Sequence, residues 1–378
     1  MISIRRVIII GATGSIGRQA IDVVARHPDR FSVVGLSAHS DEDGLVAASC
    51  HFPGAALCLS SRSPRSGAIA FSGIGGLSAL VRDTDADIVL NAASGAAGLS
   101  ISFDALSSGK DLALANKETV VMAGRLAFAA ARRTSRLILP VDSEHSAIFN
   151  MIERFGRETV RGVVITASGG AFRDEPLESL PGKKPTDALA HPTWSMGAKI
   201  TVDSATMANK GLEVIEAARL FGLTGAEIDV VLHPESRVHS FIRARDGSLY
   251  AQMSRPDMRL PILNALAWPE SVDESVADMD PCDVPLRFSR PDPERYPLLR
   301  TAYDALASGE GSTDAYNAAN EVAVAAFMDG AIRFTDIARV VSRTLERAYP
   351  PTLEGLEAVL AVDADARRVA RSIVKEIS

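Results

Sequence analysis

Short apolar runs alternate with helical patterns along the first 145 residues of the chain. Apolar runs bounded by Gly, Asp or Asn are typical of buried strands, and apolar residues at a spacing of three or four are typical of amphipathic helices. Helical stretches such as Gly17–Arg26 and Arg125–Arg132 separate the expected strands. Because such alternation forms βαβ units, we expect a mostly parallel sheet in an α/β domain over residues 1–150. The expected strands are Arg6–Ile10, Phe31–Ser37, Ile88–Ala92, Asp111–Ala115 and Leu137–Val141.

The pattern changes after residue 150, where strands and helices no longer alternate strictly. A turn at residues 245–248 separates the last two expected strands. Residues 151–284 therefore indicate an α+β domain. Residues 285–300 are rich in proline and charge and indicate a linker, and residues 301–378 predict a small helical domain. The strands expected here are Val163–Thr166, Asp229–His233, Val238–Arg243 and Ser248–Met253.

A glycine-rich loop follows the first strand and opens a helix. The segment from Gly11 to Gly17 fits a G-x-x-G-x-x-G variant of the dinucleotide fingerprint of Rossmann-like domains. Its glycines would let the backbone approach a pyrophosphate, which the helix N-terminus favours. The alternative is an ordinary strand–turn–helix junction, but the position after an N-terminal apolar strand favours nucleotide binding. No Lys or Arg follows the second strand over residues 39–43, so the loop by itself leaves NAD and NADP open.

Two carboxylates, Asp142 and Glu144, follow the fifth expected strand. If the backbone stays extended there, both side chains point the same way. Converging carboxylates suit a hard divalent cation such as Mg²⁺ or Mn²⁺. The alternative is that Asp142 or Ser143 only caps the next helix.

The segment from Thr201 to Glu213 predicts a helix that begins with Asp203 or Ser204 as its N-cap. Asn209 and Glu213 would share one face, with Lys210 about 100° away. Taken alone, this is most simply a solvated helix with a Lys–Glu pair. The functional alternative is that Lys210, Asn209 and Ser204 bind phosphate and Glu213 binds metal.

Two further loops have functional alternatives. Ser168-Gly169-Gly170 follows a strand and could bind an oxyanion, or be a plain turn. The loop over residues 186–197 contains Trp194 and Met196 between proline and glycine. Apolar side chains in such a loop favour a lid that closes over a substrate, although the loop could instead pack on its own domain.

Composition and charge narrow the class of protein. The chain has 378 residues, 47% of them hydrophobic, which is enough for two or three domains. A net charge of −7 argues against a nucleic-acid-binding protein. No stretch approaches the roughly 18 apolar residues of a membrane span. Three cysteines without paired spacing indicate reduced thiols and a cytosolic protein.

Taken together, these segments resemble the 1-deoxy-D-xylulose 5-phosphate reductoisomerase family. The matching segments occur in order along nearly the whole chain, and the one over residues 191–213 is highly specific. They are GATGSIG (11–17), LANKE (114–118), PVDSEHSAIF (140–149), TASGGAFR (166–173), HPTWSMGAKITVDSATMANKGLE (191–213), PDMRLPI (256–262) and NAANEVAVAAF (317–327).

The resemblance implies an N-terminal Rossmann-like NADPH-binding domain, a central α+β catalytic domain and a small C-terminal helical domain. It also implies roles for individual residues. The metal ligands would be Asp142, Glu144 and Glu213, and the catalytic residues Lys117, Glu144, His191 and Glu213. The substrate would contact Lys117, Ser143, Glu144, Ser168, His191, Trp194, Ser204, Asn209, Lys210 and Glu213. NADPH would contact Thr13, Gly14, Ser15, Ile16, Asn116, Glu118, Gly197 and Met258, with Met258 against the nicotinamide and Trp194 in the lid.

The implied activity is a two-stage reaction in non-mevalonate isoprenoid biosynthesis. A divalent metal (Mn²⁺, Mg²⁺ or Co²⁺) would polarise 1-deoxy-D-xylulose 5-phosphate for a carbon-skeleton rearrangement. NADPH would then reduce the branched aldehyde to 2-C-methyl-D-erythritol 4-phosphate. The resemblance further implies a cytoplasmic homodimer that phosphonates such as fosmidomycin inhibit.

Two alternatives remain beside this activity. A metal-free Rossmann dehydrogenase of an amino-acid pathway would explain residues 11–17, but not Asp142, Glu144 and Glu213 together. A redox-sensing module that binds NADP(H) would need neither metal ligands nor a phosphate site.

The resemblance breaks down after the second strand. Many family members carry a basic residue and an asparagine there, whereas this chain has His39-Ser40-Asp41 followed by Glu42 and Asp43. An acid at this position suits a bare ribose 2′-hydroxyl, while serine can donate to a 2′-phosphate. We therefore expect NADPH to be preferred by a smaller margin than in relatives with Lys or Arg here.

Overall fold

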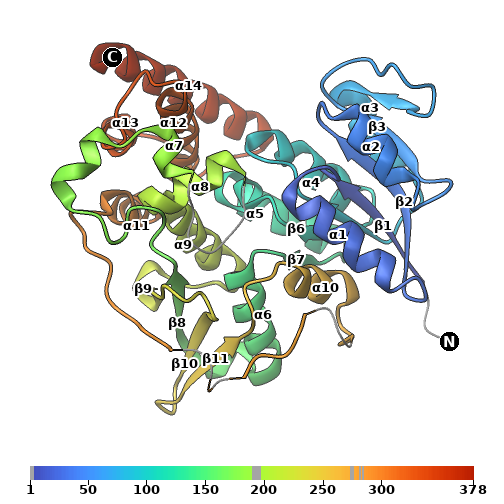
Figure 1. Ribbon diagram of the computed structural model, residues 1–378, viewed down its shortest axis with the longest axis horizontal. Coiled ribbons are helices and arrows are strands. Elements are labelled where there is room, and N and C mark those ends of the chain that lie inside the picture. Colours follow the sequence, from blue (N-terminus) through green and yellow to red (C-terminus); the bar gives the residue numbers. More distant parts are fainter. Residues whose placement is uncertain (1–3, 190–196, 273–275, 281, 283–284) are drawn as a thin grey trace. The chain divides into compact units, whose positions relative to one another are not determined.

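The computed structural model describes residues 4–189, 197–272, 276–280, 282 and 285–378. The chain forms two compact units, each with its own sheet (Figure 1). The first unit consists of Met1–Thr119, Ala127–Ser146 and Asp257–Ala277. The second consists of Val120–Leu126, Ala147–Pro256 and Asp278–Ser378. The domain boundaries expected from the sequence stay a prediction, because a division into compact units does not test which segments fold independently.

The first unit contains a seven-stranded parallel sheet with the strand order β4-β3-β2-β1-β5-β6-β7. Its strands are β1 (Arg5–Ile10), β2 (Phe31–Ala38), β3 (Ala56–Leu59), β4 (Phe71–Ser72), β5 (Ile88–Asn91), β6 (Asp111–Leu114) and β7 (Ile138–Pro140). Its helices are α1 (Ser15–Arg26), α2 (Glu42–Ser49), α3 (Gly73–Asp83), η1 (Ala96–Gly98), α4 (Leu99–Ser107) and α10 (Arg259–Ala267). Two more helices, α5 (Lys117–Thr134) and α6 (Ser143–Phe155), begin in this unit and contribute residues to both.

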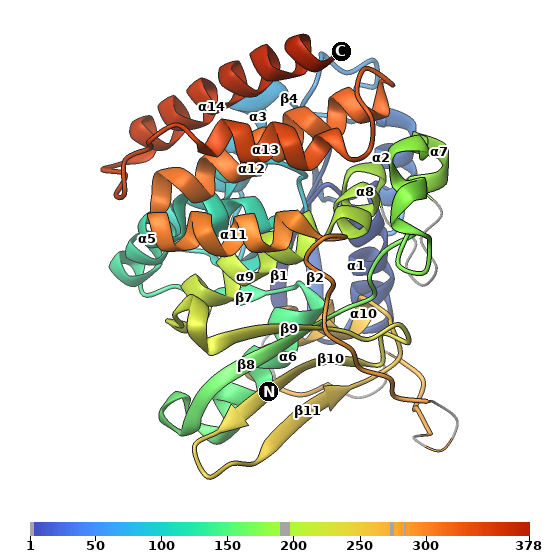
Figure 2. The ribbon, with the colours of Figure 1, turned by 90° about the vertical axis from the view of Figure 1, so that its left-hand side faces the viewer.

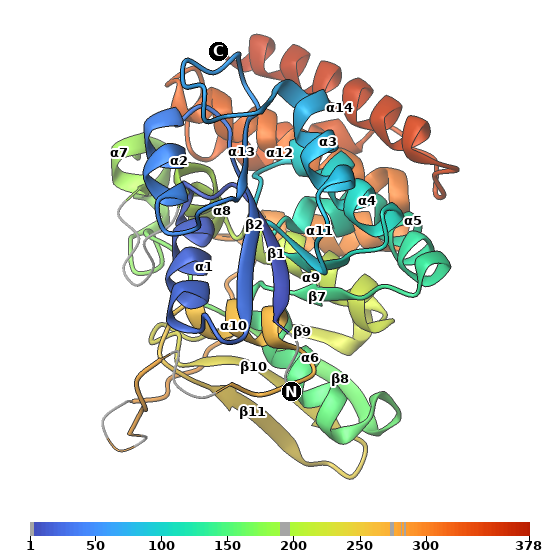
Figure 3. The ribbon, with the colours of Figure 1, turned by 90° about the vertical axis from the view of Figure 1, so that its right-hand side faces the viewer.

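The central strands of this sheet are buried on both faces, as their continuous apolar runs predict. Ile8 and Ile9 of β1 and Ile88 of β5 are fully buried. Helices α1 and α2 cover one face, and α3 and α4 cover the other (Figure 3). The strand order reverses between β1 and β5, and the carboxyl edge at such a reversal is where open α/β sheets bind ligands.

The predicted α/β fold with its five parallel strands is confirmed, but β3 and β4 were not expected from the sequence. Strand β3 is only four residues long, and β4 has two. Neither length gives a pattern that separates a strand from a loop.

The second unit contains a four-stranded mixed sheet with the order β11-β10-β8-β9. Its strands are β8 (Val160–Ala167), β9 (Ile228–Leu232), β10 (Val238–Ala244) and β11 (Leu249–Met253). All four were expected. The predicted turn between β10 and β11 is confirmed: the Ala244 N–H donates to the Ser248 carbonyl at 2.9 Å, and Gly247 adopts a φ of +94°.

Helices make up most of the second unit, and α12, α13 and α14 stack together (Figure 2). Their apolar faces form one core with α9 and α11 around the buried Tyr316 and Phe327. No helix in the described ranges is long and apolar enough to cross a membrane. The helices are η2 (Arg157–Thr159), η3 (Leu177–Gly182), α7 (Pro185–Ala188), α8 (Ala198–Thr206), α9 (Ala208–Phe221), η4 (Gly225–Glu227), α11 (Pro297–Ser308), α12 (Glu310–Met328), α13 (Asp336–Leu345) and α14 (Leu356–Ile377).

Two helix starts differ from the prediction. The segment expected as a linker, residues 285–300, includes the start of α11 at Pro297. Proline at the first helical position costs no hydrogen bond, so the same residue that suggested a linker begins a helix. The predicted N-cap at Asp203 or Ser204 is wrong, because both residues lie inside α8, whose N-cap is Gly197.

Candidate active site

The loop after β1 has the geometry of a pyrophosphate cradle. Gly11 adopts a φ of +79°, and a Cβ there would lie 2.8 Å from the Ala92 carbonyl oxygen. At Gly17 a Cβ would lie 2.2 Å from the Gly11 carbonyl oxygen, so α1 packs too closely on the loop for a side chain. The N-cap Gly14 is exposed and has no side chain to cap the helix. The first turn of α1 can therefore present N–H groups to an anion, which fits a dinucleotide.

Asn116 fixes the loops that follow β5 and β6 at the same edge of the sheet. It caps α5, because its Oδ1 accepts from the Thr119 N–H at 3.1 Å. Its Nδ2 donates to the carbonyls of Ala93 (2.9 Å) and Gly95 (2.8 Å) and to Glu118 (2.9 Å). The amide is therefore occupied within the protein, and its direct effect is to shape the edge on which a cofactor would lie.

Lys117 and Asp142 form a buried ion pair between the ends of β6 and β7. The lysine Nζ lies 2.6 Å from one carboxylate oxygen, and His145 Nδ1 lies 3.5 Å from the other. Burial opposes ionisation of Asp142, but Lys117 and His145 outweigh it and hold the pKa of the carboxyl well below its usual range. Asp142 is therefore a carboxylate at neutral pH, as a metal ligand must be.

Asp142 and Glu144 come together, but not by the alternation of an extended strand. Strand β7 ends at Pro140 and α6 begins at Ser143, so the premise of an extended backbone is wrong. Asp142 precedes the helix and Glu144 lies in its first turn, with carboxylate oxygens within 4.8 Å of each other. Ser143 donates a hydrogen bond to Glu144. Two adjacent oxygen donors at this separation fit a hard divalent cation.

In the second unit, the Ser-Gly-Gly segment after β8 makes a tight turn against α8. Gly169 and Gly170 both adopt left-handed conformations, with φ of +86° and +70°. A Cβ on Gly170 would lie 2.4 Å from the Cα of Ala205, so glycine is required there. The turn places the Ser168 hydroxyl 3.5 Å from that of Ser204. Two predicted substrate residues thus lie side by side.

Three more predicted site residues meet at the start of α9. Helices α8 and α9 are separated by Met207, whose φ of +57° ends the first helix. In the first turn of α9, Asn209 donates to one oxygen of Glu213 and Lys210 donates to the other. Lys210 and Glu213 are 5% and 1% exposed. The interpretation of this segment as a solvated helix with a surface Lys–Glu pair is therefore wrong.

Two more of the predicted cofactor residues, Gly197 and Met258, lie among the residues that the structure describes. Gly197 is exposed at the N-cap of α8, and Met258 is the N-cap of α10 in the first unit. His191, Trp194 and most of the expected lid lie outside the described residues.

Sequence reasoning missed the residues that position this part of the second unit. Asp203 is buried in α8, where it accepts from Asn320 of α12 at 2.7 Å and pairs with Lys199 at 3.0 Å. The signal was available in part, because Asn320 belongs to the conspicuous NAANE run. Where such polar residues are buried in a helix, they need hydrogen-bond partners from other elements.

The fold and the two sets of polar residues define a dinucleotide-binding α/β protein with carboxylates suited to a hard divalent cation. Comparison with models of protein families assigns the chain to a narrower class. The 1-deoxy-D-xylulose 5-phosphate reductoisomerase model matches residues 7–124, and models of that enzyme's C-terminal domains match 138–221 and 253–369. The chain belongs to the 1-deoxy-D-xylulose 5-phosphate reductoisomerase family.

Individual relatives agree with this assignment. The 1-deoxy-D-xylulose 5-phosphate reductoisomerases of Pseudomonas syringae and Cupriavidus metallidurans are 45% and 46% identical, with 97% of this chain covered in both cases and 97% and 98% of the relatives. A DOX-P reductoisomerase solved with NADPH, fosmidomycin and magnesium superposes with a TM-score of 0.90 at 37% identity over 98% of both chains. The Zymomonas mobilis enzyme with NADPH gives 0.91 at 39% identity, over 99% of this chain and 100% of that one.

Proposed function

We propose that this chain is an NADPH- and divalent-metal-dependent reductoisomerase of non-mevalonate isoprenoid biosynthesis. It would convert 1-deoxy-D-xylulose 5-phosphate, NADPH and a proton to 2-C-methyl-D-erythritol 4-phosphate and NADP⁺. The observation that carries the proposal is the combination of a pyrophosphate cradle and an ionised Asp142 at one sheet edge, in a chain of this family.

The cofactor assignment follows the glycine loop. Thr13, Gly14, Ser15 and Ile16 would bind the pyrophosphate through the first turn of α1. Asn116 and Glu118 would support the cofactor from the end of β6, as the hydrogen bonds of Asn116 suggest. Gly197 and Met258 would complete its site, with Met258 against the nicotinamide.

The metal ligands would be Asp142, Glu144 and Glu213, with Mn²⁺, Mg²⁺ or Co²⁺ as the ion. When bound, the metal polarises the ketone and hydroxyl oxygens of the substrate as a Lewis acid, and NADPH supplies the hydride. All three residues offer carboxylate oxygens, which hard cations prefer over sulfur or nitrogen.

The predicted substrate-binding residues form two groups, one for the phosphate and one for the reacting end of the substrate. Lys210, Asn209, Ser204 and Ser168 supply the cation, the amide and the two hydroxyls that a phosphate group needs. They come from the Ser-Gly-Gly turn and from α8 and α9 of one unit. We assign the phosphate of the substrate, or the phosphonate of fosmidomycin, to them.

The reacting end of the substrate would meet Lys117, Ser143 and Glu144. Lys117 already compensates the charge of Asp142, so it can hold a proton close to a metal-bound carboxylate without losing it. His191 would act beside them, and Trp194 would close the site against water. Water exclusion protects an aldehyde and strengthens the electrostatic interactions around it.

The proposal also covers the cellular location and the oligomeric state of the enzyme. The family resemblance and the reduced cysteines favour a cytoplasmic protein, and the resemblance favours a homodimer.

Consumption of NADPH, followed at 340 nm with 1-deoxy-D-xylulose 5-phosphate, tests the function. We expect turnover with added Mn²⁺ and none after chelation. Metal-independent turnover would support the alternative of a simple dehydrogenase. Binding of NADPH without turnover of this substrate under any metal condition would support a sensor.

A further inference from the structure

The acids that follow β2 are not all free to repel a phosphate. Asp41 is the N-cap of α2, where its Oδ1 accepts from the Gly44 N–H at 2.9 Å. The hydrogen bond satisfies one of the N–H groups that the first turn of a helix leaves without a partner. Asp41 therefore has a structural role as a helix cap, whether or not it also contacts a ribose.

Glu42 and Asp43 are turned toward the loop that joins β3 to β4. Glu42 is 3% exposed, accepts from the Arg65 N–H at 2.6 Å and pairs with Arg62 at 2.8 Å. Asp43 pairs with the Arg65 guanidinium at 3.2 Å. Two of the three acids that appeared to oppose NADPH are therefore paired with arginines of this loop.

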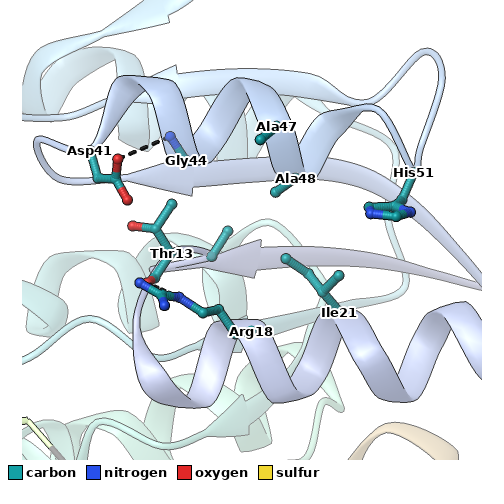
Figure 4. Close-up of a pocket in the computed structure, with 9 residues that line it drawn as sticks. Thr13, Arg18, Ile21, Asp41, Gly44, Ala47, Ala48 and His51 are labelled. Carbon is teal, nitrogen blue, oxygen red and sulfur yellow. Dashed lines mark hydrogen bonds between the residues drawn. The ribbon is translucent and has the colours of Figure 1, made fainter.

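A pocket lies between α1 and α2 beside the glycine loop, with a volume of about 420 Å³. Arg18, Thr13 and Asp41 gather at one end, and apolar side chains such as Ile21 and Ala48 line the middle (Figure 4). Thr13 and Asp41 each stand just before a helix. The polar end is therefore close to two helix N-termini, both of which favour an anion.

Arg18 is the cation of this polar end. Its Nε donates to the Thr13 carbonyl at 2.7 Å, which fixes the guanidinium beside the glycine loop. Among the described residues it forms no ion pair, so four of its five N–H groups remain for a ligand. It is exposed, and it directly follows the last glycine of the fingerprint.

We propose that Arg18 is the specificity-determining residue that receives the 2′-phosphate of NADPH. The inference rests on the proposed function only in placing the pyrophosphate at residues 13–16. The ribose that follows it lies near the end of the second strand in folds of this kind. In this chain the cation comes from α1 on the opposite wall of the pocket, not from the segment after β2. A planar guanidinium offers two parallel N–H groups to a phosphate.

Calorimetry with adenosine fragments tests the proposal without turnover. The ligands 2′,5′-ADP and 5′-AMP differ only in the 2′-phosphate, and inorganic phosphate controls for any anion. The wild-type chain should bind 2′,5′-ADP at least about tenfold more tightly than 5′-AMP, as expected for a charge-assisted pair. Arg18→Ala should remove most of this difference and leave 5′-AMP binding unchanged, and Arg18→Lys should keep part of it.

Two further variants sharpen the test. Arg26→Ala removes the same charge from an exposed position on the same helix and should change neither affinity. Asp41→Asn keeps a capping side chain and should tighten 2′,5′-ADP binding about three- to tenfold, because a repelling charge is removed. In steady state, Arg18→Ala should lower kcat/KM for NADPH and not for NADH.

Three results would overturn the assignment. Arg18→Ala could weaken both fragments equally, which would place Arg18 at the pyrophosphate. It could leave the preference for 2′,5′-ADP intact, which would mean that another residue binds the 2′-phosphate. The wild-type chain could show no preference, or bind inorganic phosphate as tightly as 2′,5′-ADP. None of these results depends on turnover, so they are separable from a failure of the proposed function.

Discussion

In each unit, one acid that is predicted to bind metal is paired with a lysine of the same unit. Lys117 lies 2.6 Å from Asp142, and Lys210 donates to Glu213. Both pairs are nearly excluded from solvent, where an unpaired charge would be costly. We expect a bound divalent cation to take over this compensation and leave both ammonium groups available to an anionic substrate.

Glu213→Gln tests the metal site at the scale of one residue. The change keeps the shape of the side chain and its bond with Asn209 but removes a charge that the metal would need. We expect turnover at limiting Mn²⁺ to fall at least about 100-fold, since a Lewis acid contributes several kcal/mol. Glu178→Gln, at an exposed position, is the matched control. Near-normal turnover and metal affinity of the Glu213 variant would contradict the assignment.

Lys210→Ala tests the phosphate assignment. A lost charge on a remote group should raise the Michaelis constant for the sugar phosphate at least about tenfold, with a smaller loss of kcat. Lys375→Ala removes an exposed lysine from α14 and should change neither constant. A Michaelis constant for the Lys210 variant that matches wild type would rule out the phosphate role.

At the scale of elements, the junction of β1 and α1 depends on the absence of side chains. Gly17→Ala would place a Cβ 2.2 Å from the backbone oxygen of Gly11, so the loop must shift. We expect a loss of stability of about 1–3 kcal/mol and at least tenfold weaker NADPH binding. Thermal unfolding and fluorescence titration with NADPH measure the two effects.

Gly75→Ala provides the control for that substitution. Gly75 lies in α3, and a Cβ added there would meet nothing within 4 Å, so alanine should stabilise the protein by about 0.5–1 kcal/mol. Equal effects of the two substitutions would show that the close approach at Gly17 does not matter.

At the scale of the whole molecule, a buried acid on α12 makes stability depend on pH. Neither carboxylate oxygen of Asp314 has a hydrogen-bond partner among the described residues, and burial, aided by nearby Asp363, raises its pKa to about 8. In the unfolded chain this carboxyl loses its proton near pH 3.8. Between about pH 4 and pH 8, the folded state therefore holds more protons than the unfolded state. Stability should therefore fall as pH rises from about 4 to about 8, by up to about 1.4 kcal/mol per unit.

Asp314→Asn should flatten that part of the stability profile. The variant should be more stable than wild type at pH 8, with a smaller gain at pH 5, when urea unfolding midpoints are compared. Asp329→Asn, on the exposed end of the same helix, should leave the profile nearly unchanged. Parallel profiles for wild type and the Asp314 variant would show that this acid does not cause the dependence.

The sequence predicted the parallel sheet and the polar residues at its carboxyl edge, because buried parallel strands produce long apolar runs that end in glycine or a polar residue. It also predicted that Lys210, Asn209 and Glu213 gather, because helical spacing places them on adjacent faces. Helix starts were less predictable. Asp203 looks like a cap in the sequence. In the structure it lies inside α8 and accepts a hydrogen bond from Asn320, which is 117 residues away.

The charges around the proposed cofactor pocket were the least predictable part of the molecule. Asp41, Glu42 and Asp43 form one acidic run in the sequence, but in the structure Asp41 caps α2 while Glu42 and Asp43 pair with arginines of the β3–β4 loop. The arginines that pair with two of them follow β3, a strand that the sequence pattern did not indicate. Local patterns cannot specify which distant charge a side chain will meet.

The product of the reaction tests the central claim most directly, because the carbon that bears the methyl group carries a hydrogen after simple reduction and none after reductoisomerisation. Simple reduction of 1-deoxy-D-xylulose 5-phosphate places the methyl beside a carbon that bears hydrogen, which gives a doublet in the proton NMR spectrum. Rearrangement before reduction makes the methyl-bearing carbon quaternary, which gives a singlet. We predict one methyl singlet formed per NADPH consumed, only with divalent metal present; a doublet, or product formed in the presence of chelator, would contradict the account.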